Sequence, residues 1–294
     1  MISAGLAQTG SLEPADRAAL LEYLPAEHSL HGLAWRFVPR QEQPRVLAID
    51  AVLANIGRIP ERVADPGVSL AKLAWWQQEL QRLVDQDAQH PLTRALLGTG
   101  AAGRLQPGLL DAYIAGVADQ VDAPSPATCA ELKQRLERSA GAAALLRCAY
   151  DEQTEAAEAL RAAGSAVALL DRLEAGVLEP LPGWLPMELV ARFGLDRRAP
   201  VPADAERALN RALATEGLAW LSAWYHLAPA GGGRLLNGPS GRFQVLRMDI
   251  THARLQRLAQ RPERFPPGRP ASLFEVFGAW AAARRLYGRS SGNG

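Results

Sequence analysis

The sequence predicts an all-α protein, folded as a single-domain helical bundle. Three observations carry this prediction. Apolar residues recur at steps of three and four through most of the chain, the alternation typical of strands is nearly absent, and short segments rich in glycine and proline separate the periodic regions. Because 48% of the 294 residues are hydrophobic, the chain can bury a sizeable core.

The clearest single helix is expected within VSLAKLAWWQQELQRLVDQ, residues 68–86. Ser69 is placed to cap its amino terminus. We interpret Trp75 and Trp76 as core residues of this helix. Its apolar stripe comprises Leu70, Leu73, Trp76, Leu80 and Leu83. The same periodicity predicts helices at about 108–122, 128–150, 153–176, 204–226, 242–260 and 271–287.

The breaks between these helices are too short to be domain linkers. They fall at Asp122–Pro126, Glu179–Trp184, Arg197–Asp204 and Pro229–Gly241, and no repeat of 20 to 50 residues is present. We therefore expect one domain over residues 26–287. A partly ordered segment, 1–25, precedes it, and a flexible tail, 288–294, follows it.

Charge and cysteine content exclude several classes of partner. The formal net charge of +1 gives no global attraction to nucleic acid. Cys129 and Cys148 match no metal or disulfide pattern, so we expect both to be reduced and buried, as in a cytoplasmic protein. Neither a signal peptide nor a membrane span is recognisable. Peripheral membrane contact stays open, with Arg284 and Arg285 read either as headgroup ligands or as a solvated helix end.

The common catalytic motifs are absent. The glycine-rich GGGRLLNGPSG lacks the Gly-Lys-Ser/Thr ending of a phosphate loop and follows no strand. Of the five histidines, only His28 and His31 share a helical face, and no cysteine or carboxylate set accompanies them. No nucleophile motif occurs either. Motifs alone therefore assign no enzyme class.

Five segments, in order along the chain, resemble the squalene/phytoene synthase family. They are WRFVPRQEQPRVLAIDAVLANIGRIPERVAD, LAWWQQELQRL with HPLTRAL, TCAELKQRLERSAGAAALL, GSAVALLDRLEAGVLEPLPGWLPMELVARFGL and PPGRPASLFEVFGAWAAARR. The resemblance spans about residues 33–285. It implies an isoprenoid-synthase-like bundle around a central cavity. It also implies the head-to-head joining of two prenyl diphosphates, with Mg²⁺ held by two facing aspartate clusters.

The first aspartate cluster of the family, Asp-Asp-x-x-Asp, has lost most of its carboxylates in this sequence. Its positions fall on Gly57, Arg58 and Glu61, so only Glu61 could still bind a metal ion. Pro60 lies inside the motif and would kink or end the helix that carries it. We interpret this stretch as the remnant of a lost metal site.

The second aspartate cluster is lost in the same way. Its two aspartates correspond to Arg172 and Gly176. Asp171 and Glu174 lie nearby, but a shift in alignment that recovers one carboxylate loses the other. In the third segment, the two tyrosines of the family pattern become Arg135 and Glu137.

Arginine has entered three positions that face the cavity in the family. Arg58, Arg135 and Arg172 are therefore candidate anion-binding residues that would act without a metal ion. The alternative is local ion pairing: Arg58 with Glu61, Arg135 with Glu131, and Arg172 with Glu174 or another helix.

Two hypotheses for function follow. The first is a family member without Mg²⁺-dependent prenyl transfer, a pseudoenzyme that acts as a binding, scaffold or assembly protein and needs no cofactor. The second is an active prenyl-diphosphate transferase, which would require Mg²⁺. The expected partner is an unknown protein or a prenyl or anionic ligand. The expected location is the cytoplasm, with peripheral membrane contact as an option.

Overall fold

The computed structural model describes residues 12–27, 29–148, 155–175, 183–196, 198–235, 239–263 and 270–287, and all regular secondary structure in these ranges is helical. The α-helices are α1 (Pro14–Leu21), α2 (Leu30–Trp35), α3 (Gln43–Gly57), α4 (Ile59–Arg62), α5 (Pro66–Val84), α6 (Pro91–Gly98), α7 (Pro107–Ala118), α8 (Cys129–Leu136), α9 (Ala142–Cys148), α10 (Glu155–Glu174), α11 (Met187–Arg192), α12 (Ala203–Leu235), α13 (Pro239–Gln260) and α14 (Leu273–Tyr287). A 3₁₀ turn, η2 (Ala102–Arg104), and a π-helical turn, η3 (Glu137–Gly141), complete the set. The all-α prediction is confirmed.

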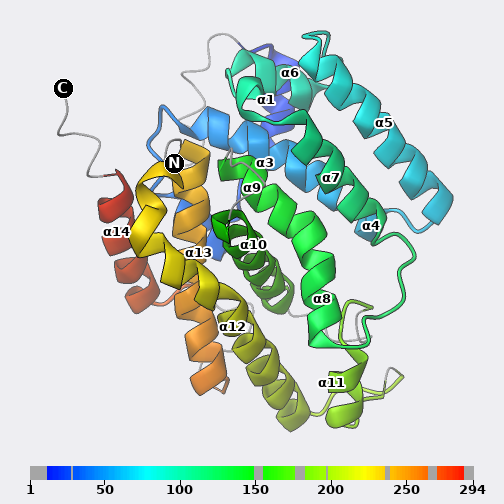
Figure 1. The fold of residues 1–294 in the computed structure, drawn as a ribbon, viewed down its shortest axis with the longest axis vertical. Coiled ribbons are helices and arrows are strands. Elements are labelled where there is room, and N and C mark those ends of the chain that lie inside the picture. The colour runs from blue at the N-terminus through cyan, green and yellow to red at the C-terminus, as the bar shows by residue number, and fades with distance from the viewer. Residues whose placement is uncertain are drawn as a thin grey trace.

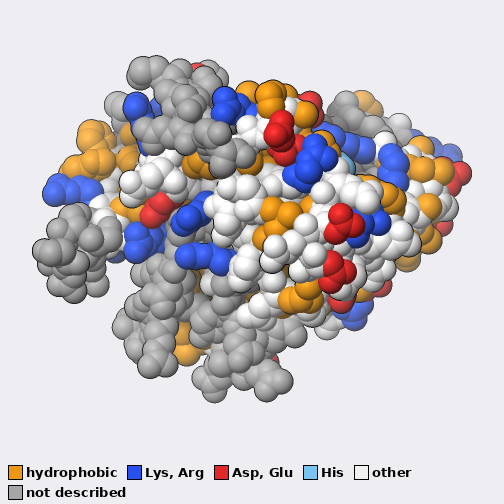
Figure 2. Space-filling model, turned by 90° about the horizontal axis from the view of Figure 1, so that it is seen from above, with side chains coloured by type: hydrophobic (Ala, Val, Ile, Leu, Met, Phe, Trp, Pro, Cys, Tyr) orange, Lys and Arg blue, Asp and Glu red, His pale blue; other side chains and the backbone are white. Residues whose placement is uncertain are grey.

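Helix α10 lies at the centre of the bundle. It packs against α12, α13, η3 and α9, while α7 packs against α5, η3 and α9 (Figure 1). Helix α14 lies at the edge of the molecule, against α13 and α2. On the face seen in Figure 2, acidic and basic side chains lie interspersed on the right-hand part, in keeping with the small net charge. No helix in the described ranges combines the length and apolar content needed to cross a bilayer.

The spacing of apolar residues does not predict helix α3, because this helix is buried on nearly every side. Such a helix carries apolar residues on every face and so has no polar stripe to reveal its period. Its single charged buried residue is Asp50. The helix ends at Gly57, and the short α4 follows with Pro60 in its first turn. Pro60 therefore breaks the helix, as the sequence predicts.

The start of α5 differs from the prediction. Pro66 is its first residue, and the Asp65 side chain accepts a hydrogen bond from the Val68 amide at 2.9 Å, so Asp65 rather than Ser69 is the amino-terminal cap. Leu70 is 49% exposed and Trp75 is 41% exposed, so neither belongs to the core. The remaining stripe residues, Leu73, Trp76, Leu80 and Leu83, are buried as expected.

The segment predicted as one helix over 128–150 contains a π turn. Helix α8 leads into η3 and then α9, and Ser139 and Ala140 of η3 line a cavity. Helix α10 passes this segment so closely that a Cβ on Gly164 would lie 2.6 Å from the Ala144 Cβ. A glycine is therefore needed at residue 164 for the close approach of the two helices.

Two further expectations need correction. Helix α12 continues to Leu235 and α13 begins at Pro239, so the break predicted at Pro229–Gly241 is shorter than expected. Cys148 is half-buried, whereas Cys129 is buried as expected, and both are free thiols. Burial raises the pKa of each thiol to about 12, which keeps both protonated at neutral pH.

Candidate ligand-binding cavity

A cavity of about 180 Å³ lies where α3, α7, η3, α9, α10 and α13 meet. Leu53, Val117, Ala143 and Val167 contribute part of its apolar wall. Its polar lining consists of Arg58, Tyr113, Gln120, Ser139, Arg147, Asp171, Gln244 and Arg247. Of its three arginines, Arg147 and Arg247 each pair with an aspartate, and Arg58 gives the lining its excess positive charge.

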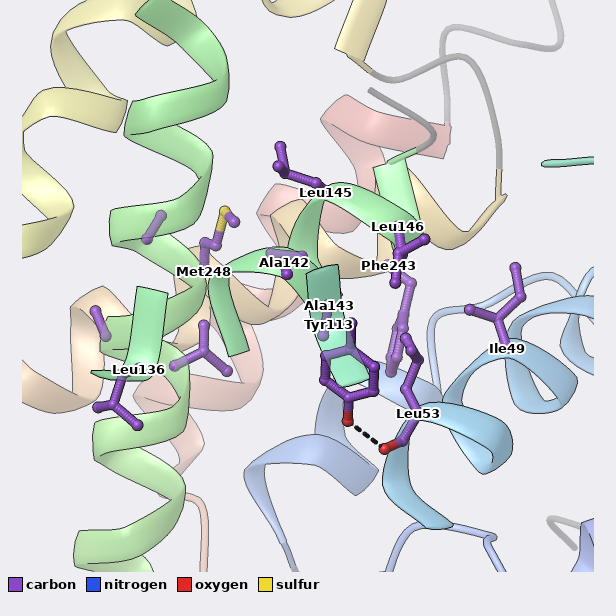
Figure 3. Packing of buried hydrophobic residues seen from close by; sticks show 14 of the residues in the cluster. Ile49, Leu53, Tyr113, Leu136, Ala142, Ala143, Leu145, Leu146, Phe243 and Met248 are labelled. Atoms are coloured by element: carbon purple, nitrogen blue, oxygen red, sulfur yellow. Dashed lines mark hydrogen bonds between the residues drawn. The ribbon is translucent and has the colours of Figure 1, made fainter. Parts of the chain in front are cut away.

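Tyr113 occupies the side of the cavity next to α3. Its hydroxyl donates a hydrogen bond to the Leu53 carbonyl at 2.5 Å (Figure 3). Burial raises the pKa of this phenol well above its usual range, so it stays protonated and acts as a donor. A Cβ on Gly57 would lie only 2.7 Å from the same hydroxyl oxygen. Tyr113 thus fills the space that a side chain at residue 57 would need.

Asp50 and Arg147 form a buried ion pair behind the cavity. Arg147 Nε donates to Asp50 Oδ1 at 2.6 Å, and His31 Nε2 lies 3.3 Å from Asp50 Oδ2. Burial alone would raise the pKa of the Asp50 carboxyl, but Arg147 and then His31 outweigh it and hold the pKa far below its usual range. The pKa of His31 is lowered, first by burial and then by Arg247. Asp50 is therefore ionised; Arg147 engages its Oδ1, whereas Oδ2 is buried with only the ion-pair contact to His31 and no hydrogen bond among the described residues.

Asp171 and Arg247 form a second ion pair at the cavity itself. Arg247 Nη2 lies 2.9 Å from Asp171 Oδ2. The arginine side chain is 8% exposed and the aspartate is 54% exposed, so the carboxylate lies on the solvent side. Burial lowers the pKa of Arg247, partly offset by Asp171. This pair neutralises the one carboxylate among the described cavity-lining residues.

Gln244 brings an unused polar group to the cavity. Its side chain is 1% exposed, and its Oε1 has no hydrogen-bond partner. A buried polar atom without a partner is costly, which favours a bound water or ligand at this point. Gln120, on the neighbouring wall, accepts a hydrogen bond from Arg172 Nη2 at 3.4 Å.

The positions predicted for the first aspartate motif are divided by the break after α3. Gly57 and Arg58 line the cavity, whereas Glu61 lies exposed on α4 and is not part of the lining. The Arg58 guanidinium lies 6.0 Å from the centre of the Tyr23 ring, and Arg58 makes no ion pair within the described part of the chain. The local pair of Arg58 with Glu61 is therefore not formed.

The other candidate arginines lie outside the cavity lining. Arg172 is beside the cavity, where burial lowers its pKa and Glu61 partly offsets that effect. Glu174 pairs with Arg254 at 2.7 Å instead of with Arg172. Arg135 pairs with Glu131, as the local alternative predicts, and also donates to the Pro124 carbonyl. Gly176 lies outside the described residues.

The residues around the cavity do not suit Mg²⁺. The ion prefers several carboxylate or water oxygens, and no group of three or more histidine, cysteine, aspartate or glutamate side chains that could hold a metal occurs in the described ranges. Asp50 and Asp171 are each paired with an arginine. These guanidinium groups lie 2.6 and 2.9 Å from the carboxylate oxygens that would have to bind the ion, so their positive charge would repel a divalent cation.

Five important residues were not identified from the sequence: Asp50, Tyr113, Arg147, Gln244 and Arg247. A usable signal was present for two of them, because Asp50 and Arg147 are each a lone charge inside an apolar helical run, VLAIDAVLANI and AAALLRCA. Such a charge must find a buried partner. Which partner it finds depends on how α3 and α9 pack, and the sequence pattern does not contain that information.

The all-α bundle around a central cavity defines an isoprenoid-synthase-like protein. The family model of squalene/phytoene synthase matches residues 29–274, and the chain belongs to this family. The structure resembles squalene synthase HpnC from Alicyclobacillus acidocaldarius, with 21% identity, a TM-score of 0.63, and coverage of 88% of this chain and 99% of that chain. It also resembles a dehydrosqualene synthase in complex with ligand, with 15% identity, a TM-score of 0.66, and coverage of 94% and 97%. No curated protein matches the sequence.

Proposed function

We propose that this family member does not carry out Mg²⁺-dependent prenyl transfer. It acts instead as a binding, scaffold or assembly protein, and its central cavity takes a small anion without a metal ion. The observation that carries the proposal is the Asp171–Arg247 pair, in which the one carboxylate of the described cavity lining is neutralised by an arginine 2.9 Å away.

The size of the cavity supports the same proposal. Pockets for small organic ligands usually measure roughly 300–1,000 Å³. A volume of about 180 Å³ lies below that range and is too small for two prenyl chains side by side. A phosphate-sized or carboxylate-sized group is the better match.

The polar groups of the lining favour an anion. Arg58 is free of carboxylate partners among the described residues, and a guanidinium binds phosphate or carboxylate oxygens through paired N–H donors. The unpartnered Oε1 of Gln244 would accept a hydrogen bond from a hydroxyl group on the ligand. Monohydrogen phosphate carries both kinds of group.

The test is thermal unfolding with diphosphate, with Mg²⁺, and with Mg²⁺ plus a non-hydrolysable farnesyl diphosphate analogue. A ligand that binds only the folded state at 100 times its Kd adds roughly 2.7 kcal/mol of stability. Diphosphate alone should raise Tm, and Mg²⁺ should add nothing. Arg58→Gln should reduce the rise, whereas Arg135→Gln, which lies outside the cavity lining, is the matched control.

The alternative function is head-to-head transfer between prenyl diphosphates, and membership of the family favours it. It requires a Tm rise that depends on Mg²⁺, together with release of diphosphate from farnesyl diphosphate. Those two results would overturn the proposal. If no ligand changes Tm, the hypothesis that the cavity binds an anion is rejected. The scaffold function is then tested by partner capture.

A further inference from the structure

The outer face of α14 exposes two aromatic side chains one helical turn apart. Phe277 is 65% exposed and Trp280 is 48% exposed. Gly278 and Ala281 beside them are also exposed. Exposed aromatic residues grouped in this way are uncommon on a protein surface that faces only water.

Two arginines continue this face toward the end of the helix. The Arg284 guanidinium lies 4.9 Å from the centre of the Trp280 ring, and Arg284 makes no ion pair within the described ranges. Arg285 is 73% exposed and lies 3.7 Å from Asp249, which is a long ion-pair distance. Figure 2 shows hydrophobic and basic side chains together at the left edge, the side on which α14 lies in Figure 1.

The exposed part of α14 carries no acidic group. The only carboxylate of the helix, Glu275, is 2% exposed and lies 2.9 Å from Arg257 and 3.5 Å from Arg254. This inward network holds α14 against α13 and removes the negative charge from its outer face. The exposed face of α14 therefore carries aromatic and positively charged side chains.

We propose that the α14 face, defined by Phe277, Trp280, Arg284 and Arg285, binds the surface of a membrane rich in anionic phospholipid. Tryptophan and phenylalanine insert at the level of the headgroups, where their rings leave water. Arginine N–H groups bind lipid phosphates, and a guanidinium stacked on an indole keeps its edge free for them. The charge of the face matches this partner, and the contact is peripheral. This inference does not depend on the cavity or on its ligand.

The experiment is co-sedimentation of the full chain with vesicles of phosphatidylcholine alone or mixed with phosphatidylglycerol. Binding should require phosphatidylglycerol and weaken as salt rises. Phe277→Ala with Trp280→Ala, and Arg284→Gln with Arg285→Gln, should each weaken binding roughly tenfold or more. Trp75→Ala is the matched control, because Trp75 is a 41% exposed tryptophan under an arginine, Arg82, but on α5. It should bind like the unaltered chain.

A second readout does not depend on removing the aromatic rings. Brominated lipid should quench part of the tryptophan fluorescence of the bound protein, and Trp280→Phe should lose that part while it still binds. Unchanged binding in both double variants, or equal loss in Trp75→Ala, would overturn the proposal. A third result would also overturn it: the protein does not bind vesicles, and it forms a dimer that dissociates when Phe277 and Trp280 are both changed to alanine. In that case a second copy of the chain covers the α14 face.

Discussion

The Tyr113 hydroxyl lies 2.7 Å from the point that a Cβ on Gly57 would occupy, and it donates a hydrogen bond to the Leu53 carbonyl, one turn earlier in α3. Residue 57 is the position at which the first aspartate motif of the family would begin. An aspartate side chain at residue 57 would therefore require Tyr113 to move.

Gly57→Ala should destabilise the protein by about 1–3 kcal/mol, because the new methyl group overlaps the Tyr113 hydroxyl. In a Tyr113→Phe background the same change should be neutral or stabilising, since the overlap is gone and alanine favours helix more than glycine. Denaturant unfolding of the four proteins measures the coupling. An equal cost in both backgrounds would show that the contact does not matter.

Arg147→Met should destabilise the protein by about 3–5 kcal/mol, because it leaves the Asp50 charge buried without its main partner. Adding Asp50→Leu should recover part of that loss. Arg138→Met is the control, because Arg138 pairs with Asp119 on the surface and both side chains are at least half exposed. It should change stability by less than about 1 kcal/mol. If the double variant is less stable than Arg147→Met, the explanation is incorrect.

Stability should fall as pH drops from about 7 to 5, and His31 should account for part of the fall. The pKa of His31 is lower in the folded protein than in the unfolded chain, so the unfolded chain takes up a proton first and acid favours unfolding. His31→Gln should reduce this slope. The lowered pKa of Asp50 adds a further loss below about pH 4. Tm measured against pH for both proteins tests the assignment, and parallel curves between pH 7 and 5 would refute it.

Glu79→Gln should destabilise the start of α6 by about 1–3 kcal/mol. The buried Glu79 carboxylate accepts hydrogen bonds from the amides of Gln89 and His90 at 2.9 and 2.8 Å, and it pairs with Arg82 at 2.9 Å. A neutral amide accepts these bonds more weakly and also brings unwanted donors. Hydrogen exchange at α6 measures the effect. Unchanged exchange protection there would contradict this role for Glu79.

The sequence predicted helices best where one face of the helix is exposed to solvent and the opposite face is buried. Helices α5, α7, α10 and α13 lie near their predicted positions. Helix α5 shows the pattern most clearly, because Lys72, Gln77 and Gln78 are exposed whereas most of its apolar stripe is buried. Helix α3 was missed because almost all of it is buried. The cap of α5 was misplaced because Asp65 and Pro66 supply a stronger start signal than Ser69.

The candidate site was predicted only in part. Gly57 and Arg58 line the cavity, but Arg135 and Arg172 do not. Helical spacing relates residues on one helix, whereas the cavity gathers side chains from six separate segments. Its main electrostatic contacts join α3 to α9 and α10 to α13, across 97 and 76 residues of sequence.

The sequence by itself determined the all-α class, most long helices and the family resemblance, and it predicts that the aspartate motifs are lost. These properties depend on local periodicity and on the identity of single residues. Only the tertiary structure decided that Tyr113 fills the space beside Gly57, that Asp50 pairs with Arg147, and that Asp171 pairs with Arg247. A lone charge in an apolar run must find a partner, but the packing of the helices selects which one.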